Sequence, residues 1–383
     1  MNRDLFLVAL ALATWGVGEG MFLLFQPLYL QELGANPVMI GAIMSVIGVA
    51  MGAAHLPAGY LADRFGRRPM LILAWVLGTI AAWIMALSKS LPAFVLGSSL
   101  YGLTSFVMVP LYSYVTAARG NWSVGRALTL ISAIYNIGAI LGPVLGGWVG
   151  ERSGLRANFQ VAAFIFIFSS LMILLIRPQP VETSSEMDQQ GRWRSLLDRR
   201  LLQYAFVVFI VMFSMILPQP LSQNFLQNER GLSLAQIGRL ISARSIGIVL
   251  LNLTLGQLNA RLGFLISQAA MGVSAFLLWQ GTGVYIYALG YLLMGSQQTA
   301  RTLATAQGRI LIQAANMGIA YGLLETVAAL ANVLAPALAG YLYSRQPSLI
   351  YSTGLICIVI AILLTVLISP IRMRDLASKD LEV

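Results

Sequence analysis

The sequence predicts an all-α protein that crosses a lipid bilayer many times. Of its 383 residues, 58% are hydrophobic and only 10% are charged, and its mean hydropathy is +0.79. Soluble domains carry about a quarter charged residues. Apolar stretches of about 17–27 residues recur along the chain, which is the length needed to cross the hydrocarbon core of a membrane. We therefore expect an integral membrane protein rather than a series of soluble domains.

Apolar runs bounded by charged or turn residues predict twelve transmembrane helices. In the first half of the chain they cover about residues 5–31, 38–61, 70–88, 92–118, 126–149 and 158–177. In the second half they cover about residues 200–227, 236–258, 264–280, 284–308, 318–343 and 348–369. A polar segment rich in arginine, glutamate, serine and glutamine separates the halves. The predicted division is an N-terminal six-helix bundle over 1–177, a linker over 178–200 and a C-terminal bundle over 201–383.

The composition argues against several other classes of protein. One cysteine, Cys357, and one histidine, His55, are too few for a disulfide framework or a multi-histidine metal site. The net charge of +10 comes from basic residues scattered in short loops, so a nucleic-acid partner is not expected. Nothing resembles the phosphate-binding loop of an ATP-driven engine. We expect neither an enzyme nor a bound metal or organic cofactor.

Basic residues indicate the orientation, because positively charged short loops stay on the cytoplasmic side. If the N-terminus is cytoplasmic, most arginines fall on the cytoplasmic side, including those of the linker. We therefore expect a multi-pass protein of the cytoplasmic (inner) membrane, with both termini inside.

The two halves of the chain resemble each other. The segment GYLADRFG at 59–66 recurs as GQLNARLG at 256–263, which is 197 residues later. The segment GPVLGG at 142–147 recurs as APALAG at 335–340, which is 193 residues later. Two markers in the same order at nearly constant offset predict a duplicated six-helix unit with a central substrate site between the copies.

The loop between the second and third spans carries a recognisable pattern: a glycine, an aspartate four residues later, then a glycine followed by basic residues. Its members are Gly59, Asp63, Arg64, Gly66 and Arg67. With the twelve spans and the degenerate second copy, this loop resembles the cytoplasmic signature of the major facilitator superfamily. The resemblance implies two six-helix bundles that rock around a central cavity.

The same resemblance implies a cytoplasmic latch. Asp63, Arg64, Arg67 and Arg126 would hold the halves together against the start of span eleven, near residues 316–319. The alternative is that these arginines serve only membrane topology. Because alanine replaces the aspartate in the second copy, a second latch should be weaker or absent.

Span five contains Gly138, Gly142, Pro143 and Gly146 in a pattern that resembles the fifth helix of the 12-span drug and metabolite:proton antiporters. The glycines share one helix face and would let another helix approach closely, while Pro143 would allow a bend. A plain packing face is the alternative to a gating role for Gly142 and Pro143. Span four lacks the arginine that those antiporters usually place there.

Four ionisable residues fall inside predicted spans, where charge is costly and therefore points to function. They are Glu19, Arg244, Arg301 and Glu325. Glu19 is the preferred proton or cation carrier, and the alternative is that it only makes a polar helix contact. Arg244 could pair with Glu19 or attract an anionic substrate. Arg301 and Glu325 could form a bridge, unless Arg301 extends to the membrane interface instead.

Further cavity candidates share helix faces with these residues. Trp15, Glu19 and Gln26 fall on one face of span one. Others are Asn136 with Thr129 and Ser132, Gln219 with Gln223, Gln297 with Arg301, and Asn332 with Tyr321 and Glu325. The alternative for each polar side chain is a hydrogen bond between helices.

The favoured function is secondary active transport of a small organic solute by alternating access, with proton-coupled export and the proton as coupling ion. The expected partners are the substrate and the bilayer, and the chain is expected to work as a monomer. A symporter that imports a sugar, organic acid or amino acid with protons or sodium would share this architecture. A transport-inactive receptor or scaffold is the alternative from another class.

Overall fold

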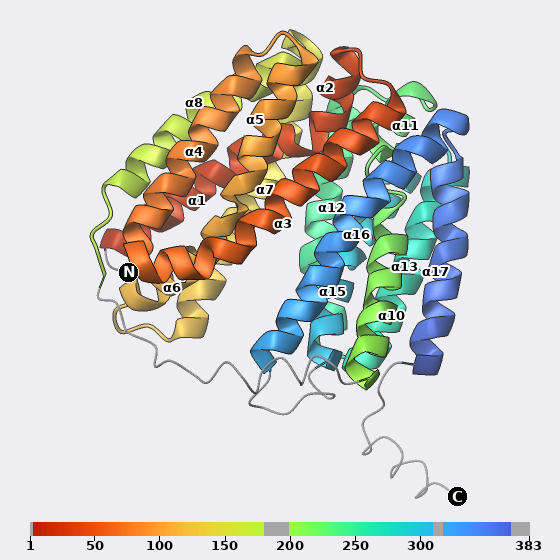
Figure 1. Ribbon diagram of the computed structural model, residues 1–383. Coiled ribbons are helices and arrows are strands. Elements are labelled where there is room, and N and C mark those ends of the chain that lie inside the picture. Colours follow the sequence, from red (N-terminus) through yellow and green to blue (C-terminus); the bar gives the residue numbers. More distant parts are fainter. Residues whose placement is uncertain (1–2, 180–198, 309–316, 369–383) are drawn as a thin grey trace, which may run out of the picture. The chain divides into compact units, whose positions relative to one another are not determined.

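The computed structural model describes residues 3–179, 199–308 and 317–368 (Figure 1). Within these ranges the regular structure is entirely helical, which confirms the predicted fold class. Ten helices there are long and apolar enough to cross a membrane, or up to eleven if the bent pair over the fourth predicted span is one crossing. The remaining predicted span, 284–308, contains a polar second half that lowers its hydropathy.

The helices of the first half follow the six predicted spans. They are α1 (Arg3–Phe22) with the 3-10 turn η1 (Leu23–Phe25) and α2 (Gln26–Glu32), α3 (Pro37–Phe65), α4 (Arg67–Leu87), α5 (Leu91–Leu103) with η2 (Thr104–Val107) and α6 (Met108–Ala118), α7 (Val124–Ser153), and α8 (Leu155–Leu174).

The helices of the second half repeat this order. They are α10 (Arg199–Ile216) with α11 (Ser222–Asn228), α12 (Leu234–Leu255), α13 (Ala260–Gln280), α14 (Val284–Met294) with α15 (Ser296–Gly308), α16 (Met317–Arg345) and α17 (Leu349–Ile368).

Interruptions fall in the first, fourth, seventh and tenth predicted spans, which is every third span. The first and fourth contain a 3-10 turn. Pro218 and Pro220 separate α10 from α11, where proline removes backbone donors, and Gly295 separates α14 from α15. Broken helices inside a membrane occur where the freed backbone is buried in protein or lines a polar cavity. Because the interruptions recur in every third span, they indicate a three-helix repeat within each half.

The described helices group into two compact units. The first contains residues 1–184 together with 221–245, and the second contains 185–220 and 246–383. Segment 221–245, which holds α11 and the first half of α12, therefore packs with the N-terminal helices. The division into bundles over 1–177 and 201–383 stays a prediction, and most of the linker over 178–200 lies outside the described residues.

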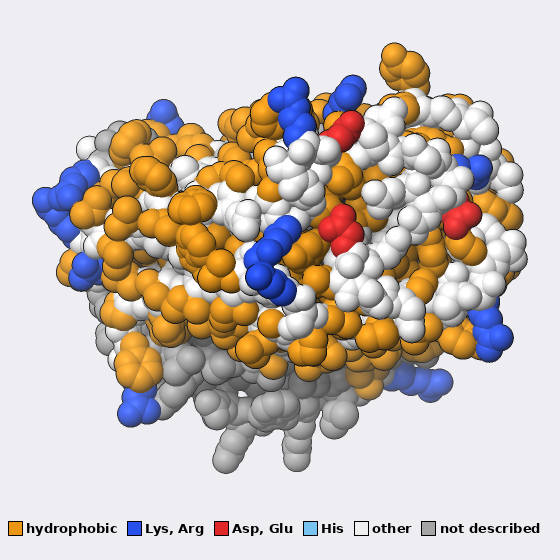
Figure 2. Space-filling view, turned by 90° about the horizontal axis from the view of Figure 1, so that it is seen from above, with side chains coloured by type: hydrophobic (Ala, Val, Ile, Leu, Met, Phe, Trp, Pro, Cys, Tyr) orange, Lys and Arg blue, Asp and Glu red, His pale blue; other side chains and the backbone are white. Residues whose placement is uncertain are grey.

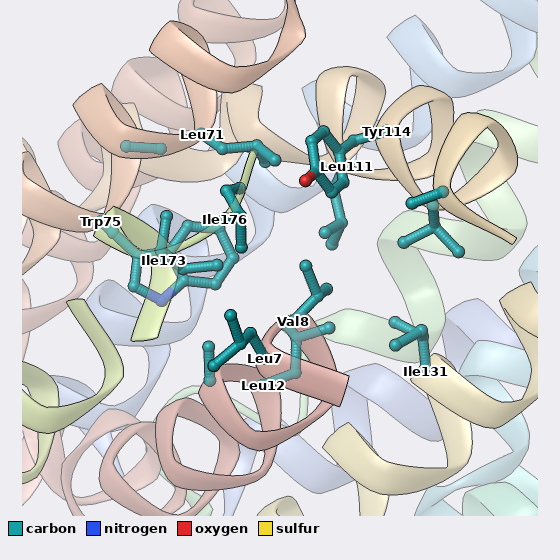
Figure 3. Close-up of a cluster of buried hydrophobic side chains, with 14 of the residues drawn as sticks. Leu7, Val8, Leu12, Leu71, Trp75, Leu111, Tyr114, Ile131, Ile173 and Ile176 are labelled. Atoms are coloured by element: carbon teal, nitrogen blue, oxygen red, sulfur yellow. The ribbon is translucent and has the colours of Figure 1, made fainter. Parts of the chain in front are cut away.

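A hydrophobic core lies inside the first unit (Figure 3). Leucine, isoleucine, valine and aromatic side chains from α1, α4, α6, α7 and the end of α8 meet there, and they include Leu7, Val8, Leu12, Leu71, Trp75, Leu111, Tyr114, Ile131, Ile173 and Ile176. The Tyr114 hydroxyl donates to the carbonyl of Arg177 at 2.7 Å. The backbone N–H of Arg177 in turn donates to Asp4 at 3.1 Å. These bonds fix the chain that leaves α8 against the start of α1.

The outer surface is largely hydrophobic, while polar side chains are buried. Figure 2 shows hydrophobic side chains over much of one face, with Lys and Arg side chains at several places and acidic ones at fewer. Phe168 is 67% exposed and Leu96 63% exposed, whereas Asn158 and Gln268 are fully buried. Polar groups inside and apolar groups outside are what a lipid environment requires. The chain is thus a multi-pass membrane protein.

Candidate functional site

Helices α1 and α7 lie in close contact through the glycines that the sequence placed on one face. A Cβ atom added at Gly142 would lie 2.4 Å from the carbonyl oxygen of Val17, and one added at Gly146 would lie 2.4 Å from that of Met21. On the α1 side, a Cβ atom at Gly16 would lie 2.5 Å from the carbonyl of Tyr135. The predicted close approach is confirmed, and the helix that approaches is α1.

An adjacent face of α7 contacts α12 within the first unit. A Cβ atom at Gly147 would lie 2.6 Å from the carbonyl of Leu234. Pro143 leaves the carbonyl of Ala139 without its usual N–H donor, and the Ser245 hydroxyl donates to that carbonyl at 3.3 Å. Pro143, the residue predicted to allow a bend, therefore frees a backbone carbonyl of α7, and a side chain of α12 donates a hydrogen bond to it.

This close packing places the carboxylate of Glu19 against two tyrosines. The Tyr135 hydroxyl, from α7, donates to Oε2 of Glu19 at 2.6 Å. The hydroxyl of Tyr101, from α5, also lies near this carboxylate and interacts with it. Within the described part of the chain, the partners of Glu19 are these hydroxyls and not Arg244. The pairing with Arg244 that the sequence allowed is therefore not among these contacts, and a role for Arg244 in attracting an anionic substrate stays a prediction.

Aromatic rings form one wall beside the carboxylate. The indole of Trp15, one turn before Glu19, stacks on Phe166 with ring centroids 3.9 Å apart and planes 3° apart. Tyr101 lies nearly parallel to Trp15 at 6.1 Å, and Trp75 is tilted at 5.3 Å. Trp15 thus lies beside Glu19, as its helical spacing predicted.

Gly78 in α4 makes room for this indole, and sequence reasoning did not single it out. A Cβ atom at Gly78 would lie 2.4 Å from Cη2 of Trp15. Phe166 occupies the space beside Gly18 in the same way, since a Cβ atom there would lie 2.6 Å from its ring. A glycine in the middle of span three was the one available signal, and its partner could not be inferred without the helix arrangement.

The third residue predicted for the same face of α1, Gln26, lies beyond an irregular turn, and its role in binding stays a prediction. The turn η1 interrupts the helix between Glu19 and Gln26, so the regular helical spacing assumed for the three residues does not hold. Gln26 is buried and its side-chain amide lies 3.9 Å from the sulfur of Met85 in α4. Gln26 is therefore not among the contacts of Glu19.

Most of the other Asn and Gln side chains predicted to line the cavity form hydrogen bonds with residues close to them in the sequence. Asn136 donates to the carbonyl of Ser132 at 2.8 Å, Gln219 to that of Met215 at 2.7 Å, and Asn332 to that of Ala328 at 3.0 Å. Gln223 accepts a hydrogen bond from Ser222 at 3.2 Å, and Gln297 is buried in α15. A role for these amides in binding stays a prediction.

The second unit contains the predicted ion pair. Nε of Arg301 in α15 donates to Oε2 of Glu325 in α16 at 3.0 Å, and a second guanidinium nitrogen contacts the same oxygen. The two side chains are 36% and 46% exposed. The predicted bridge is confirmed, and it joins the polar half of the tenth span to the eleventh.

The predicted cytoplasmic latch is described only in part. Gly66 has φ 86°, a left-handed conformation that favours glycine, between α3 and α4. The guanidinium of Arg126 lies 4.3 Å from the ring centroid of Trp122, and that of Arg64 lies over Phe65. The side chains of 55–63 and of the start of span eleven lie outside the described residues, so the latch, including Gly59, Asp63 and Arg67, stays a prediction.

A polar cluster between α2 and α11 was missed by sequence reasoning. Asn224 donates to Gln31 at 2.7 Å and to the carbonyl of Pro27 at 3.2 Å, and Asn228 donates to Gln31 at 3.0 Å. Positions 27 and 224, like 31 and 228, are related by the repeat offset of 197. Corresponding turns of the two repeats therefore meet each other, and the repeat offset is the signal that could have found them.

Glu151 at the end of α7 adds a further contact to α12. Its Oε2 accepts from the backbone N–H of Ala235 at 2.8 Å and from the Ser233 hydroxyl at 2.9 Å. A carboxylate at the first turn of a helix satisfies free N–H groups and complements the helix dipole. This cap and the cluster of Gln31, Asn224 and Asn228 together hold 221–245 within the first unit.

Comparison with known proteins agrees with this architecture. The family model described as Major Facilitator Superfamily matches residues 8–221. Multidrug resistance protein 2 of Bacillus subtilis (strain 168) is 23% identical over 350 residues, covering 85% of each chain. Multidrug resistance protein 1 of the same organism is 21% identical over 235 residues, and the match covers 60% of each chain.

Solved structures show the same fold over nearly the whole chain. The crystal structure of the nucleoside transporter NupG superposes with a TM-score of 0.79 at 16% identity, covering 96% of this chain and 98% of that one. The members of the matching family move small solutes through membranes and are not enzymes. The chain belongs to the major facilitator superfamily of membrane transporters.

Proposed function

We propose that this transporter exports a small organic solute in exchange for protons, by alternating access. The observation that carries the proposal is the intramembrane carboxylate of Glu19, which two tyrosine hydroxyls contact and which has no arginine partner among the described residues. An intramembrane acid without a basic partner can gain and lose a proton without breaking an ion pair. Two relatives that are multidrug resistance proteins by name support an organic solute and export.

The geometry can accommodate both protonation states of Glu19. As a carboxylate, it accepts a hydrogen bond from Tyr135, and the Tyr101 hydroxyl lies near it as a second possible donor. As a carboxylic acid, it can donate to one phenol oxygen while still accepting from the other, because a hydroxyl both donates and accepts. The tyrosines can therefore reorient their hydroxyl groups instead of losing their partner.

Coupling would follow from competition at this carboxylate. A proton on Glu19 and a solute that needs its negative charge or its acceptor oxygens cannot both be bound at full strength. Binding of the proton would therefore lower the affinity of the protein for the solute, and binding of the solute would lower its affinity for the proton. This reciprocity is the thermodynamic requirement for exchange. The stacked rings of Trp15, Tyr101 and Phe166 supply an apolar surface beside the charge.

Proteoliposome transport tests the direction and the coupling ion. A thermal-shift screen of the purified protein first identifies a stabilising solute, and labelled solute is then followed under imposed proton gradients. We expect protons moving down their gradient to drive the solute in the opposite direction. A pH-sensitive dye should then report proton movement opposite to the solute flux. Movement of solute and protons in the same direction would establish the importing symporter, and sodium dependence without proton dependence would contradict proton coupling.

The proposal places the protein in the cytoplasmic membrane as a monomer with both termini inside. Cysteine labelling of a Cys357→Ser background tests the orientation, with one new cysteine at Lys89 and one at Arg177. We expect an impermeant reagent added to intact cells to label only position 89. Labelling of position 177 instead would reverse the orientation.

A further inference from the structure

One arginine–aromatic pair occurs in both halves of the chain, directly after the repeated glycine–proline segment. In α7 the guanidinium of Arg152 lies 4.2 Å from the ring centroid of Trp148. In α16 the guanidinium of Arg345 lies 5.3 Å from the ring centroid of Tyr341. Both members of the second pair stand 193 residues after those of the first, which is the offset of the repeated segment. Among the cation–π contacts of the described residues, these two alone are related by the repeat.

Both pairs are exposed at the end of an apolar helix. Trp148 is 50% exposed and Tyr341 is 49% exposed. Each arginine lies in the last turn of its helix, one turn after the ring that it covers. The two arginines are themselves exposed, and the ion pair formed by the described residues lies elsewhere, between Arg301 and Glu325. The repeat has therefore preserved two positive charges that no described carboxylate neutralises.

The geometry of each pair suits one kind of ligand. Stacking on a ring occupies one face of the guanidinium and leaves N–H groups at its edge that match the oxygens of a phosphate. In the second pair one of these N–H groups also donates to the Tyr341 hydroxyl at 3.3 Å, and the remaining ones can reach a phosphate. An aromatic ring at the end of a membrane span lies at headgroup depth, where its apolar body and polar edge are both satisfied. A half-exposed ring beside an available arginine therefore meets a lipid headgroup more readily than a solute dissolved in water.

We propose that each pair binds the phosphate of a membrane phospholipid headgroup, so that the transporter carries two lipid sites related by its internal repeat. The arginine holds the phosphate, and the ring of Trp148 or Tyr341 packs beside the glycerol and the first acyl carbons. The competing explanation is that each arginine only complements the dipole at its helix end. That explanation requires neither the ring nor a phosphate, so the two can be separated.

Native mass spectrometry of the delipidated full chain tests the proposal. Phosphatidylglycerol is added in one arm, and a diacylglycerol glycolipid without phosphate is added in the other. We expect up to two tightly retained phosphatidylglycerol molecules and weaker retention of the glycolipid. Arg152→Gln and Arg345→Gln should each weaken one site by about fivefold, which corresponds to about 1 kcal/mol per arginine near a membrane surface. The double variant should lose both sites.

Lys89→Gln is the matched control, because it removes one exposed positive charge that follows α4 in the first unit. We expect it to retain phosphatidylglycerol as the unmodified chain does. Trp148→Leu keeps every charge and should weaken the first site alone. Equal losses in Lys89→Gln and Arg152→Gln would overturn the proposal, since diffuse charge would then explain binding.

Two further outcomes would overturn the proposal as well. Displacement of the lipid by millimolar inorganic phosphate would show a site for the free anion. Unchanged binding in the double arginine variant, with its melting temperature preserved, would leave only the helix-dipole role. Because lipid binding is measured without transport, these outcomes are independent of the proposed proton-coupled export.

Discussion

Two charged sites inside the membrane were indicated by the same sequence argument, but they have different structures. In the first unit, the carboxylate of Glu19 contacts tyrosine hydroxyls in a tightly packed region between α1 and α7. In the second unit, the carboxylate of Glu325 pairs directly with Arg301, and both side chains are more than a third exposed. An ion pair stabilises the charged form of both partners, whereas a hydroxyl accommodates either form of an acid. The difference underlies our proposal that Glu19 exchanges protons and that the pair has a structural or charge-setting role.

The largest expected difference between the two sites is in proton coupling. Glu19→Gln should remove the dependence of flux on the proton gradient, a loss of about 5- to 150-fold, which is the usual size of coupling between two ligands. Glu325→Gln should keep that dependence even if the rate falls. Flux measured at several pH values in proteoliposomes checks this, and a pH-independent Glu325→Gln beside a pH-dependent Glu19→Gln would reverse the assignment.

Packing between α1 and α7 provides the next test. Gly142→Val should destabilise the first unit by about 1–3 kcal/mol or prevent folding, because a Cβ atom at this position would lie 2.4 Å from the carbonyl of Val17. Gly322→Ala in α16 is the control, since an added Cβ atom there meets open space. Thermal unfolding in detergent compares them. Equal melting temperatures would show that the helices are not held this closely.

Removing one hydroxyl tests whether the tyrosines affect the protonation of Glu19. Tyr135→Phe keeps the ring but leaves the Glu19 carboxylate with one hydroxyl partner fewer. A hydrogen bond to a charged group contributes about 1.5–3 kcal/mol. We therefore expect the variant to favour protonated Glu19, and its pH–flux profile should move to higher pH. A profile that matches the unmodified protein would mean that the 2.6 Å contact has no part in coupling.

The smallest expected effect concerns the exposed ion pair. A double-mutant cycle with Arg301→Gln and Glu325→Gln should give a coupling energy of about 0.2–1 kcal/mol in thermal or denaturant unfolding, because water and mobile side chains weaken exposed pairs. A value of several kcal/mol would show that the pair is more buried in the membrane than its exposure suggests.

Much of the fold could be predicted from the sequence because bilayer thickness fixes the length of an apolar span. The close glycine face of α7 was also predictable, since helical spacing alone places 138, 142 and 146 together. The contacts of Glu19 were not, because Tyr135 and Tyr101 lie on other helices and nothing in their spacing distinguishes them. The 3-10 turn after Glu19 was not predicted either, because an irregular turn inside an apolar run leaves no pattern in composition.

The most direct test of the account is infrared difference spectroscopy of the purified protein during a pH titration. Protonated carboxyl groups absorb apart from carboxylates and amides, so the state of Glu19 can be followed without a known substrate. We expect a titrating carboxyl band that disappears in Glu19→Gln and persists in Glu325→Gln. The same band with unchanged amplitude in Glu19→Gln would show that another group takes up the proton, and Glu19 would then not be the proton carrier.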